Sequence, residues 1–398
     1  MMEPTVRFPE FKGSWNNYKI EDMFDRVGTP VDLDDTQTYR EIGIRSHGKG
    51  IFHKEETTAT EIGNKRVFWV EPDCFVVNIV FAWERAVAKT TEKENGMIAS
   101  HRFPMYKPKK DVVDLDYITE YFITKRGQNV LILASPGGAG RNKTLGQKEF
   151  AKSIVKLPSL PEQQKIADFL STIDTVIEKQ KETVSAWEER KKGVMQKLFS
   201  QEVRFKADDG SNFPEWEEKK LGEVGDIVTG NTPSTKQNDY YGECYLWVTP
   251  TDITDSREVT STAKMLTELG YTVARHIPAN SILVTCIASI GKNAILRENG
   301  SCNQQINSIT PYDEYSVEFV YYLICQNEKL LHANAGTGGM EILNKENFSK
   351  IKMYFPCFAE QQKIADCLSS LDEVIEKQKA TLAAWEELKK GLLQQMFV

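Results

Sequence analysis

Several short segments combine glycine with basic side chains, and their spacing limits the chemistry that they can perform. Residues 43–50 read GIRSHGKG and differ from the phosphate-binding pattern GxxxxGK[ST] at its last position. Gly50 stands where that loop carries the hydroxyl that holds magnesium, so we do not expect nucleotide binding here. Arg45, His47 and Lys49 suit contact with DNA instead, because arginine pairs with guanine edges and lysine with phosphate. A solvated charged turn is the alternative for this segment.

Two further groups of candidate DNA contacts lie downstream in the first half of the chain. Clustered cations favour phosphate contact because they release counterions from DNA. Solvated surface is the alternative for both groups. The first group is Ser100, His101, Arg102, Lys107 and Lys109, and the second, after the glycine-rich stretch at 137–140, is Arg141, Asn142 and Lys143.

The second half of the chain offers amides and hydroxyls more than charge. Asparagine and glutamine amides match the edge of adenine, and small hydroxyls suit base edges or phosphates. Turn capping and hydrogen bonding to the local backbone are the alternative on such Pro/Gly-rich loops. The candidates are Asn231, Thr232, Ser234, Lys236, Lys292, Asn293, Asn303, Gln304 and Thr337.

Residue patterns for catalysis and for metal binding are missing from the sequence. There is no Asn/Asp-Pro-Pro-aromatic motif of the kind that adenine methyltransferases use, and no HExxH. The five histidines are scattered, and the seven cysteines form no CxxC pair. We therefore expect no catalytic residue, no metal site and no cofactor bound by this chain. We also expect reduced thiols in a cytoplasmic protein with no membrane partner, because the longest apolar run, Ser281–Ile290, is too short to span a bilayer.

The charge of the 398-residue chain is distributed unevenly. The formal net charge is −7, which by itself disfavours a nucleic-acid partner, but DNA responds to the local field. Segment 101–156 carries 11 Lys/Arg against 5 Asp/Glu, and the acidic connector 201–218 carries 2 against 6. Segment 219–357 carries 12 against 15, so the second half is not basic. Electrostatics therefore supports DNA contact in the first half alone.

An internal repeat organises these loops. Residues 160–199 match residues 358–397 at 26 of 40 positions without a gap, at an offset of 198. Both copies contain EQQKIA, and the sequences that precede them have diverged almost completely. The chain is thus a variable domain followed by a shared segment, twice over.

The shared segments have the composition and periodicity of long helices. They contain no internal proline, and apolar residues recur at alternating spacings of four and three, which is a heptad seam. The polar exceptions, Gln180 and Lys191 in the first copy and Gln378 and Lys389 in the second, occupy identical places. Each helix would be about 58 Å long, and the two would bury their apolar stripes by packing on each other. Under a pseudo-two-fold axis they would run antiparallel. A plain dimerisation coiled coil is the alternative. The seam includes Ile166, Leu170, Ile173, Ile177, Trp187, Ile364, Leu368, Leu371, Ile375 and Trp385.

This organisation resembles the specificity subunit of type I restriction-modification enzymes over essentially the whole chain. The EQQKIA start of each helix is its most specific motif. The stretches Tyr39–Phe52, Asn78–Trp83 and Gly230–Ser234 are similar to segments of the target-recognition domains of that family. Ala359 departs from the pattern, because Pro161 occupies that place in the first copy.

The resemblance implies a function, a set of partners and a fold. Each recognition domain would read one half of a split DNA sequence, while the helices set the spacer and dock two modification subunits. Those subunits would use S-adenosylmethionine to methylate adenine, and restriction subunits would use ATP and magnesium. We expect an α+β fold with recognition domains of mixed sheet and short helices at 1–157 and 201–357, and antiparallel coiled-coil helices at 158–200 and 358–398. The alternatives are a coiled-coil adaptor whose domains bind proteins and a self-sufficient nuclease or methyltransferase.

Overall fold

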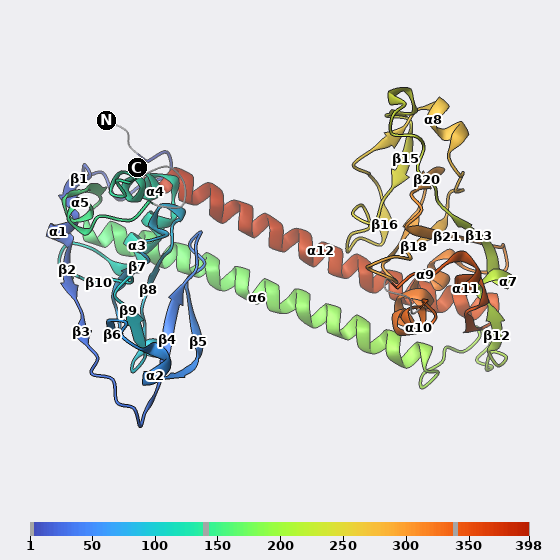
Figure 1. Ribbon diagram of the computed structural model, residues 1–398, viewed down its shortest axis with the longest axis horizontal. Coiled ribbons are helices and arrows are strands. Elements are labelled where there is room, and N and C mark those ends of the chain that lie inside the picture. The colour runs from blue at the N-terminus through green and yellow to red at the C-terminus, as the bar shows by residue number, and fades with distance from the viewer. Residues whose placement is uncertain (1–3, 138–142, 337–340, 398) are drawn as a thin grey trace. The chain divides into compact units, whose positions relative to one another are not determined.

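The computed structural model describes residues 4–137, 143–336 and 341–397, which fold as two compact units (Figure 1). Unit 1 comprises residues 1–181 and 380–398, and unit 2 comprises residues 182–379. Helices α6 (Leu160–Phe199) and α12 (Phe358–Met396) coincide closely with the two segments that the repeat marked as helical. The unit boundary crosses both helices, so each unit contains one head, the part outside the long helices, and about half of each long helix.

The head of unit 1 consists of short strands in mixed sheets with a few helices. Its sheets have the strand orders β1-β11, β2-β10-β7-β8 and β3-β6-β9-β4-β5, and the β4–β9 pair is parallel. The strands are β1 (Asn16–Lys19), β2 (Phe24–Val27), β3 (Thr29–Pro30), β4 (Thr38–Ile44), β5 (Ile51–Thr58), β6 (Val67–Trp69), β7 (Phe75–Val77), β8 (Val87–Lys89), β9 (Ile98–Ser100), β10 (Met105–Pro108) and β11 (Ile154–Leu157). The helices are α1 (Ile20–Met23), α2 (Ala59–Ile62), α3 (Leu115–Ile123), α4 (Lys125–Leu133) and α5 (Gln147–Lys152).

The head of unit 2 has the same kind of construction. Its sheets have the strand orders β12-β22, β13-β21-β18-β19-β16 and β14-β17-β15-β20. The strands are β12 (Glu217–Lys220), β13 (Gly225–Thr229), β14 (Tyr241–Gly242), β15 (Tyr245–Val248), β16 (Glu258–Val259), β17 (Met265–Leu266), β18 (Ser281–Thr285), β19 (Asn293–Leu296), β20 (Gly300–Cys302), β21 (Ile306–Pro311) and β22 (Lys352–Phe355). The helices are α7 (Leu221–Val224), α8 (Glu268–Val273), α9 (Val317–Gln326), α10 (Glu328–Ala333) and α11 (Lys345–Lys350). The expected α+β fold with mixed sheets is confirmed.

Both heads share a frame despite their diverged sequences. Each opens with a four-residue strand that pairs antiparallel with the head's last strand, with Asn16 opposite Leu157 in unit 1 and Glu217 opposite Phe355 in unit 2. A single helical turn follows the opening strand, and a long helix begins a few residues after the closing strand. In both heads, the pairing of the first and last strands therefore places the end of the head at the start of the long helix, α6 in unit 1 and α12 in unit 2.

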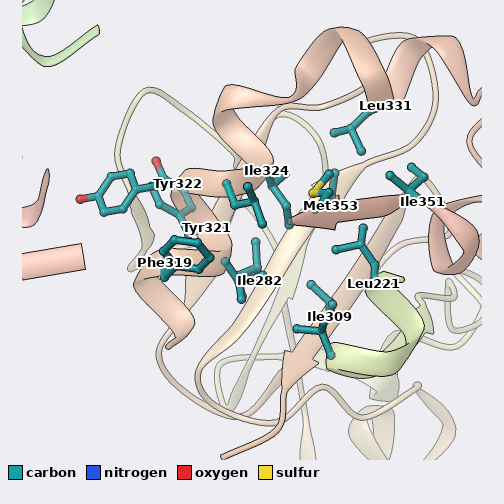
Figure 2. Packing of buried hydrophobic residues seen from close by; sticks show 14 of the residues in the cluster. Leu221, Ile282, Ile309, Phe319, Tyr321, Tyr322, Ile324, Leu331, Ile351 and Met353 are labelled. Atoms are coloured by element: carbon teal, nitrogen blue, oxygen red, sulfur yellow. The ribbon is translucent and has the colours of Figure 1, made fainter. Parts of the chain in front are cut away.

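The core of each unit includes the first turns of the long helix that follows its head. In unit 2, α9 packs on strands β18 and β21, and Figure 2 shows Phe319 and Ile324 beside Ile282. Ile364 and Leu368 of α12 belong to this same core, and Ile166 and Leu170 of α6 play the equivalent part in unit 1. Burying one such side chain contributes about 1.5–3 kcal/mol, so head and helix stabilise each other.

Burial along the seam is most complete in the first turns of each long helix, next to its head. A pair of helices covers only one side of each apolar stripe, so the stripe is fully buried only where a head covers it as well. Ile166, Leu170, Ile173, Ile177, Ile364, Leu368 and Ile375 are buried, whereas Leu371, Trp187 and Trp385 are half-buried.

Ion pairs show that the long helices run antiparallel within unit 1. Asp174 of α6 lies 2.7 Å from Lys389 of α12, and Lys181, further along α6, contacts Glu386, which is earlier on α12. Lys389 is one of the polar positions in the predicted seam. It also contacts Glu120 of α3, at 3.4 Å, so it joins the seam to the head.

The same arrangement holds within unit 2. Lys191, the second polar seam position, lies 2.6 Å from Asp372, and Glu188 lies 2.9 Å from Lys379. The Lys191 ammonium also lies 5.2 Å from the ring centre of Tyr322, whose hydroxyl donates to Asp372. A lysine paired with an aspartate on the facing helix is thus repeated in both units. Because a shifted register would separate these partly buried charges, they specify the alignment of the helices.

The EQQ residues of the repeat connect each long helix to its head. In unit 1 the Glu162 side chain is 1% exposed and accepts two hydrogen bonds from Arg7, at 2.7 and 2.8 Å. Gln163 accepts from the backbone N–H of Asp114 at 3.0 Å and donates to the carbonyl oxygens of Val112 and Pro158. Asp114 is the N-cap residue of α3, so the glutamine fixes the start of that helix.

Unit 2 repeats these contacts with different surroundings. Glu360 accepts from Arg204 at 2.8 and 3.1 Å and from the indole N–H of Trp216 at 3.2 Å. Gln361 accepts from the backbone N–H of Ser316, the N-cap of α9, and donates to the carbonyl of Pro356. The EQQ motif is therefore a structural connection between head and helix.

Removing the Glu360 carboxylate should destabilise unit 2. In Glu360→Ala, the Arg204 guanidinium and the Trp216 indole lose a shared, fully buried acceptor, a change that costs about 3 kcal/mol. We expect an earlier urea midpoint in the transition reported by tryptophan fluorescence. Glu373→Ala, at an exposed position of α12, is the matched control and should leave the midpoint unchanged. Equal midpoints for both variants would contradict the structural role of the motif.

The carboxyl group of Glu120 should make stability depend on pH. Burial raises the pKa of Glu120, and its Oε2 atom has no hydrogen-bond partner among the described residues. A raised pKa in the folded state adds stability below the unfolded pKa, and this contribution is lost as the pH rises through the folded pKa. Glu120→Gln removes the titration and leaves Lys389 paired with Asp174.

The free energy of unfolding of Glu120→Gln should therefore rise relative to that of the unmodified chain as the pH rises above the ordinary carboxyl pKa of 4.5. Urea denaturation at a series of pH values measures this difference. Glu55→Gln, at an exposed position of β5, should show a constant difference. A difference for Glu120→Gln that falls with pH would contradict the prediction.

Candidate nucleic-acid interface

The sheet of unit 1 places several predicted DNA contacts at one edge. Strands β4 and β9 are parallel, with Glu41 opposite Ile98, so Ile44 at the end of β4 is level with His101 just after β9. Because the carboxyl ends of parallel strands meet at the same edge, the loop at 45–50 lies beside the turn at 100–103. The two segments are more than 50 residues apart in the sequence, and the sheet brings them together.

The loop at 45–50 joins β4 to β5 and has a firmly anchored backbone. His47 and Gly48 have φ angles of 63° and 68°, and their N–H groups donate to the carbonyls of Glu84 and Arg85. A Cβ atom on Gly48 would lie 2.7 Å from Ile123, so the close approach requires glycine. The side chains of Arg45, His47 and Lys49 are exposed above this fixed backbone.

The guanidinium group of Arg45 is held by its own hairpin. It lies 4.9 Å from the ring centre of Phe52 and donates to the carbonyl of Ile51 at 3.4 Å. A stacked, exposed guanidinium keeps donors available for base edges or phosphates.

The turn after β9 connects to two other segments of the head. The N–H of His101 donates to the carbonyl of Arg66, and the carbonyl of Arg102 accepts from Ile79. The carbonyl of Ile79 in turn accepts from the N–H of Leu145, which links the backbone two residues after Lys143 to this turn, and the Lys143 side chain is half-buried. Side chains of His101 and Arg102 are exposed, whereas Ser100 is half-buried and its hydroxyl accepts from the N–H of Arg102.

Arg66 belongs to this edge although the sequence analysis did not select it. It is exposed and directly precedes β6, which pairs antiparallel with β9 so that Val67 is opposite Ser100. The basic pair Lys65 and Arg66 just before a short β-branched and aromatic strand was the available signal. We define the basic edge as Arg45, His47, Lys49, Arg66, His101, Arg102 and Lys143.

Other predicted residues of the first half are placed differently. The ammonium of Lys107 donates to the carbonyl of Pro72 at 2.7 Å, and that of Lys109 donates to the carbonyl of Glu21 at 3.0 Å. Both lysines lie at the opposite end of β10 from Arg102, because β10 leads away from the turn. These contacts place them outside the basic edge. Arg141 and Asn142 lie outside the described residues.

In unit 2 the structure joins two predicted loops. Thr232, after β13, donates its hydroxyl to the Gln304 side chain at 2.6 Å, and both residues are exposed. The backbones beneath them are in close contact, because a Cβ atom on Gly230 would lie 2.1 Å from the carbonyl oxygen of Cys302. A hydroxyl and an amide from separate loops therefore form one polar surface, which we call the polar edge.

Three of the predicted amides form hydrogen bonds within the loops of unit 2. Asn231 accepts from the N–H of Arg275 at 2.6 Å and donates to the carbonyl of Val273. Asn303 is buried and bonds Gln305 through both side-chain atoms. Asn293 donates to the carbonyl of Gly291. The turn-capping alternative fits these residues.

The remaining candidates of unit 2 are exposed cations and hydroxyls. Ser234 and Lys236 follow Thr232 on the same loop, and Lys292 lies in the turn between β18 and β19. Thr337 lies outside the described residues.

An aromatic stack beside the polar edge was missed by sequence reasoning. The Tyr245 and Tyr271 rings are parallel at 3.9 Å between centres, and His276 stacks on Tyr271 at 4.1 Å. Arg275, next to this stack, is exposed and donates to the carbonyl of Thr229 at the end of β13. No spacing in the sequence joins these residues, because they come from β15, α8 and the loop that follows α8.

Reactive groups are not gathered at either edge. Burial raises the pKa of the Cys74 and Cys286 thiols to about 11, which disfavours the nucleophilic thiolate. Within the ranges that the structure describes, no three His, Cys, Asp or Glu side chains are grouped as metal ligands. Across the same ranges, no helix is both long and apolar enough to cross a membrane. The described edges can offer hydrogen bonds, cations and aromatic faces, which is chemistry for binding.

Known proteins of similar sequence are specificity subunits. The MjaIX specificity subunit of Methanocaldococcus jannaschii is 32% identical over 211 residues, which is 50% of this chain and 48% of that protein. The HindI specificity subunit of Haemophilus influenzae is 34% identical over 177 residues, covering 42% of this chain and 38% of that protein. The chain thus aligns with about half the length, or less, of these relatives.

Solved structures share the fold at low sequence identity. The S subunit of a type I restriction-modification system from M. genitalium superposes with a TM-score of 0.58 at 14% identity, covering 100% of this chain and 99% of that one. A chain from a study of complex assembly and conformational transition of the type I system gives 0.61 at 16% identity, covering 98% of each chain.

The model of the type I restriction modification DNA specificity domain matches twice, at residues 13–185 and 214–384. Each match covers one head together with most of the long helix that follows it. The family expected from the EQQKIA repeat is confirmed: the chain belongs to the type I restriction-modification DNA specificity family and carries two of its domains.

Proposed function

We propose that this chain is the DNA-recognition subunit of a type I restriction-modification complex, with each head reading one half of a two-part target. The observation that carries the proposal is the duplicated specificity domain, in which each copy presents an exposed edge of loops built on a shared frame. Loops on a rigid scaffold suit this task, because their side chains can change without loss of the fold.

The basic edge supplies the first contact surface. Its exposed cations lie on anchored turns at a sheet edge, so few conformations are lost when they bind phosphate or guanine. The surplus of positive charge in segment 101–156 strengthens the local field.

The polar edge supplies the second contact surface by different chemistry. Thr232 and Gln304 offer a hydroxyl and an amide for base edges, and Lys236, Arg275 and Lys292 are exposed cations in the same head. These contacts suit readout by hydrogen bonds more than attraction through charge.

The catalytic steps would belong to partner subunits. Two modification subunits docked on the long helices would hold S-adenosylmethionine, and restriction subunits would hold ATP and magnesium, all in the cytoplasm. Under this proposal the chain itself binds no cofactor.

Purified alone with S-adenosylmethionine and magnesium, the chain should neither methylate nor cut DNA. Turnover by the single chain would refute the assignment.

The long helices set the separation between the two half-sites. A helix of 40 residues is about 60 Å long, and successive major grooves on one face of DNA are about 34 Å apart, so the helices are long enough for the task. The lysine–aspartate pairs that align them fix the length of the spacer.

Selection from a random-sequence DNA pool, with the modification subunit present, tests the function directly. Sequencing of the bound fraction should give a motif of two specified parts around unspecified bases. No enrichment would favour a protein-binding adaptor instead.

Substitutions in the two edges should alter different halves of that motif. Arg102→Ala removes an exposed guanidinium from the basic edge and should relax one half, with about a tenfold loss of affinity. Gln304→Ala removes an amide from the polar edge and should relax the other half alone. The readout is the selected motif of each variant.

Arg40→Ala is the matched control for this pair of substitutions. Arg40 is exposed on β4, away from the basic edge, and pairs with Glu56, so its loss should change neither half. If Arg102→Ala and Gln304→Ala relaxed the same half, the assignment of one edge to each half-site would be wrong.

A change in helix length should change the spacer. Insertion of one heptad near the middle of both α6 and α12 keeps the seam in phase and lengthens each helix by about 10 Å, roughly three base pairs of DNA. Methylation sequencing in cells should then show a different number of unspecified bases. Seven substitutions at exposed helix positions, without insertion, should leave the number unchanged. An unchanged spacer after the insertion would exclude the helices as the ruler.

A further inference from the structure

A cavity of about 790 Å³ lies in unit 1, where α3 and α4 meet the ends of the long helices that belong to this unit. Its lining contains six basic side chains and three acidic ones, next to an apolar wall. Ligand sites for small molecules are commonly 300–1,000 Å³ in volume. Nine of the fifteen lining residues here are charged, which suits a charged ligand more than an apolar one. The basic lining residues are Arg85, Lys125, Arg126, Lys181, Lys389 and Lys390.

The acidic residues of the lining all form ion pairs, although two lysines serve the three of them and Lys389 also contacts Glu120. Asp174 pairs with Lys389, and both Glu178 and Glu386 pair with Lys181. The cations left over are Arg85, Lys125 and Arg126, which form no ion pair within the described part of the chain, and Lys390, which pairs with Glu387 outside the cavity.

Two guanidinium nitrogens at the cavity are buried without an acceptor. Arg85 donates one Nη1 hydrogen bond to the carbonyl of Ile123, but its Nε has no partner among the described residues, and the same holds for Nη1 of Arg126. A buried donor without an acceptor is costly, and native proteins rarely retain one without a reason. Because both nitrogen atoms are closed to solvent, an oxyanion in the cavity would reach them only after the guanidinium groups turn toward it.

The backbone adds to the attraction for an anion. Lys125 and Arg126 are the first two residues of α4, where the N–H groups have no partner from the helix itself and the helix dipole is positive. Thr124 caps this end and also lines the cavity. Guanidinium groups, an ammonium and a helix N-terminus together match the geometry of a phosphate.

This arrangement is particular to unit 1. Helix α10 of unit 2 begins with Glu328 where α4 begins with Lys125, although the EQQ contacts and the lysine–aspartate pairs recur in both units. The shared frame therefore does not require the charge pattern of the cavity. A surplus of cations that the shared frame does not require is available to a ligand.

We infer that this cavity binds a phosphorylated small molecule of nucleotide size. Arg85, Lys125 and Arg126 hold the phosphate at the start of α4. The apolar wall of Ile123, Ile177, Leu393 and Phe397 covers the rest of the ligand. The cavity adjoins the loop at 45–50, because the N–H of Gly48 donates to the carbonyl of Arg85 and Gly48 packs on Ile123. None of the side chains of the basic edge lines the cavity, so its ligand is distinct from the DNA that this edge contacts.

Isothermal titration of the full chain with AMP, inorganic phosphate and adenosine tests the inference. AMP should bind, phosphate should compete with it, and adenosine should bind far more weakly. Arg126→Gln should weaken AMP binding about tenfold, as expected for one charge-assisted hydrogen bond. Arg40→Gln, at an exposed and ion-paired arginine of the same unit, should leave the affinity unchanged.

Thermal melting without ligand separates binding from folding. Because the Arg126 donor lacks an acceptor, Arg126→Gln should melt no lower than the unmodified chain. If it does melt lower, Lys125→Gln, at an exposed side chain, is used in its place and should weaken AMP binding with the fold intact.

Three results would overturn the inference. The first is the absence of AMP binding, and the second is equal affinity of the unmodified chain and the variants. The third is competition between AMP and a short DNA duplex, which would assign the cavity to the DNA surface. AMP binding that is unaffected by a duplex that itself binds supports the separate site. AMP binding by a chain that binds no duplex supports the ligand site and counts against the proposed recognition function alone.

Discussion

The fold depends on a buried carboxylate at the start of each long helix. Glu162 and Glu360 are withdrawn from water and paired with an arginine from the segment before the first strand of each head. A buried charge is tolerated only with such a partner, so the pair fixes where the chain before the head meets the helix after it. The neighbouring glutamine then holds the N-cap of α3 or α9. The head is thereby closed on its own helix, and its loops are free to vary.

Much of this architecture could be predicted from the sequence because it is repeated and periodic. The gap-free match at an offset of 198 and the heptad spacing predicted both long helices, and the two lysines in the seam gave its polar positions. The partners of those lysines could not be predicted, because Asp174 and Asp372 face them only when the helices run antiparallel. The EQQ motif was correctly taken as specific to the family, but its role needed the position of Arg7 and Arg204.

The candidate site was less predictable, for a physical reason. Loop residues acquire neighbours from the sheet, and the parallel pairing of β4 with β9 joins segments that no local pattern connects. Basic residue clusters were a fair guide where a turn exposes them, as at Arg102. They failed where a strand follows, because Lys107 and Lys109 bond to backbone carbonyls at the far end of β10. Amides were hardest to assign, since Asn231 and Gln304 are equally polar and only one faces solvent.

Comparison of the two units shows which contacts are the same in both copies of the fold and which differ. Contacts that join head to helix recur with the same residue types, whereas residues at the loop edges and at the cavity of unit 1 differ between the units. Glu120 of α3 and Tyr322 of α9 are an intermediate case. Each lies on the head helix beside the seam and contacts the seam lysine of its own unit, Glu120 through its charge and Tyr322 through its ring. A position that must contact lysine accepts either side chain, because a carboxylate and an aromatic face both attract a cation. A stable frame therefore requires only a side chain that attracts the lysine at such positions. Other residues of each head can vary and are available for binding.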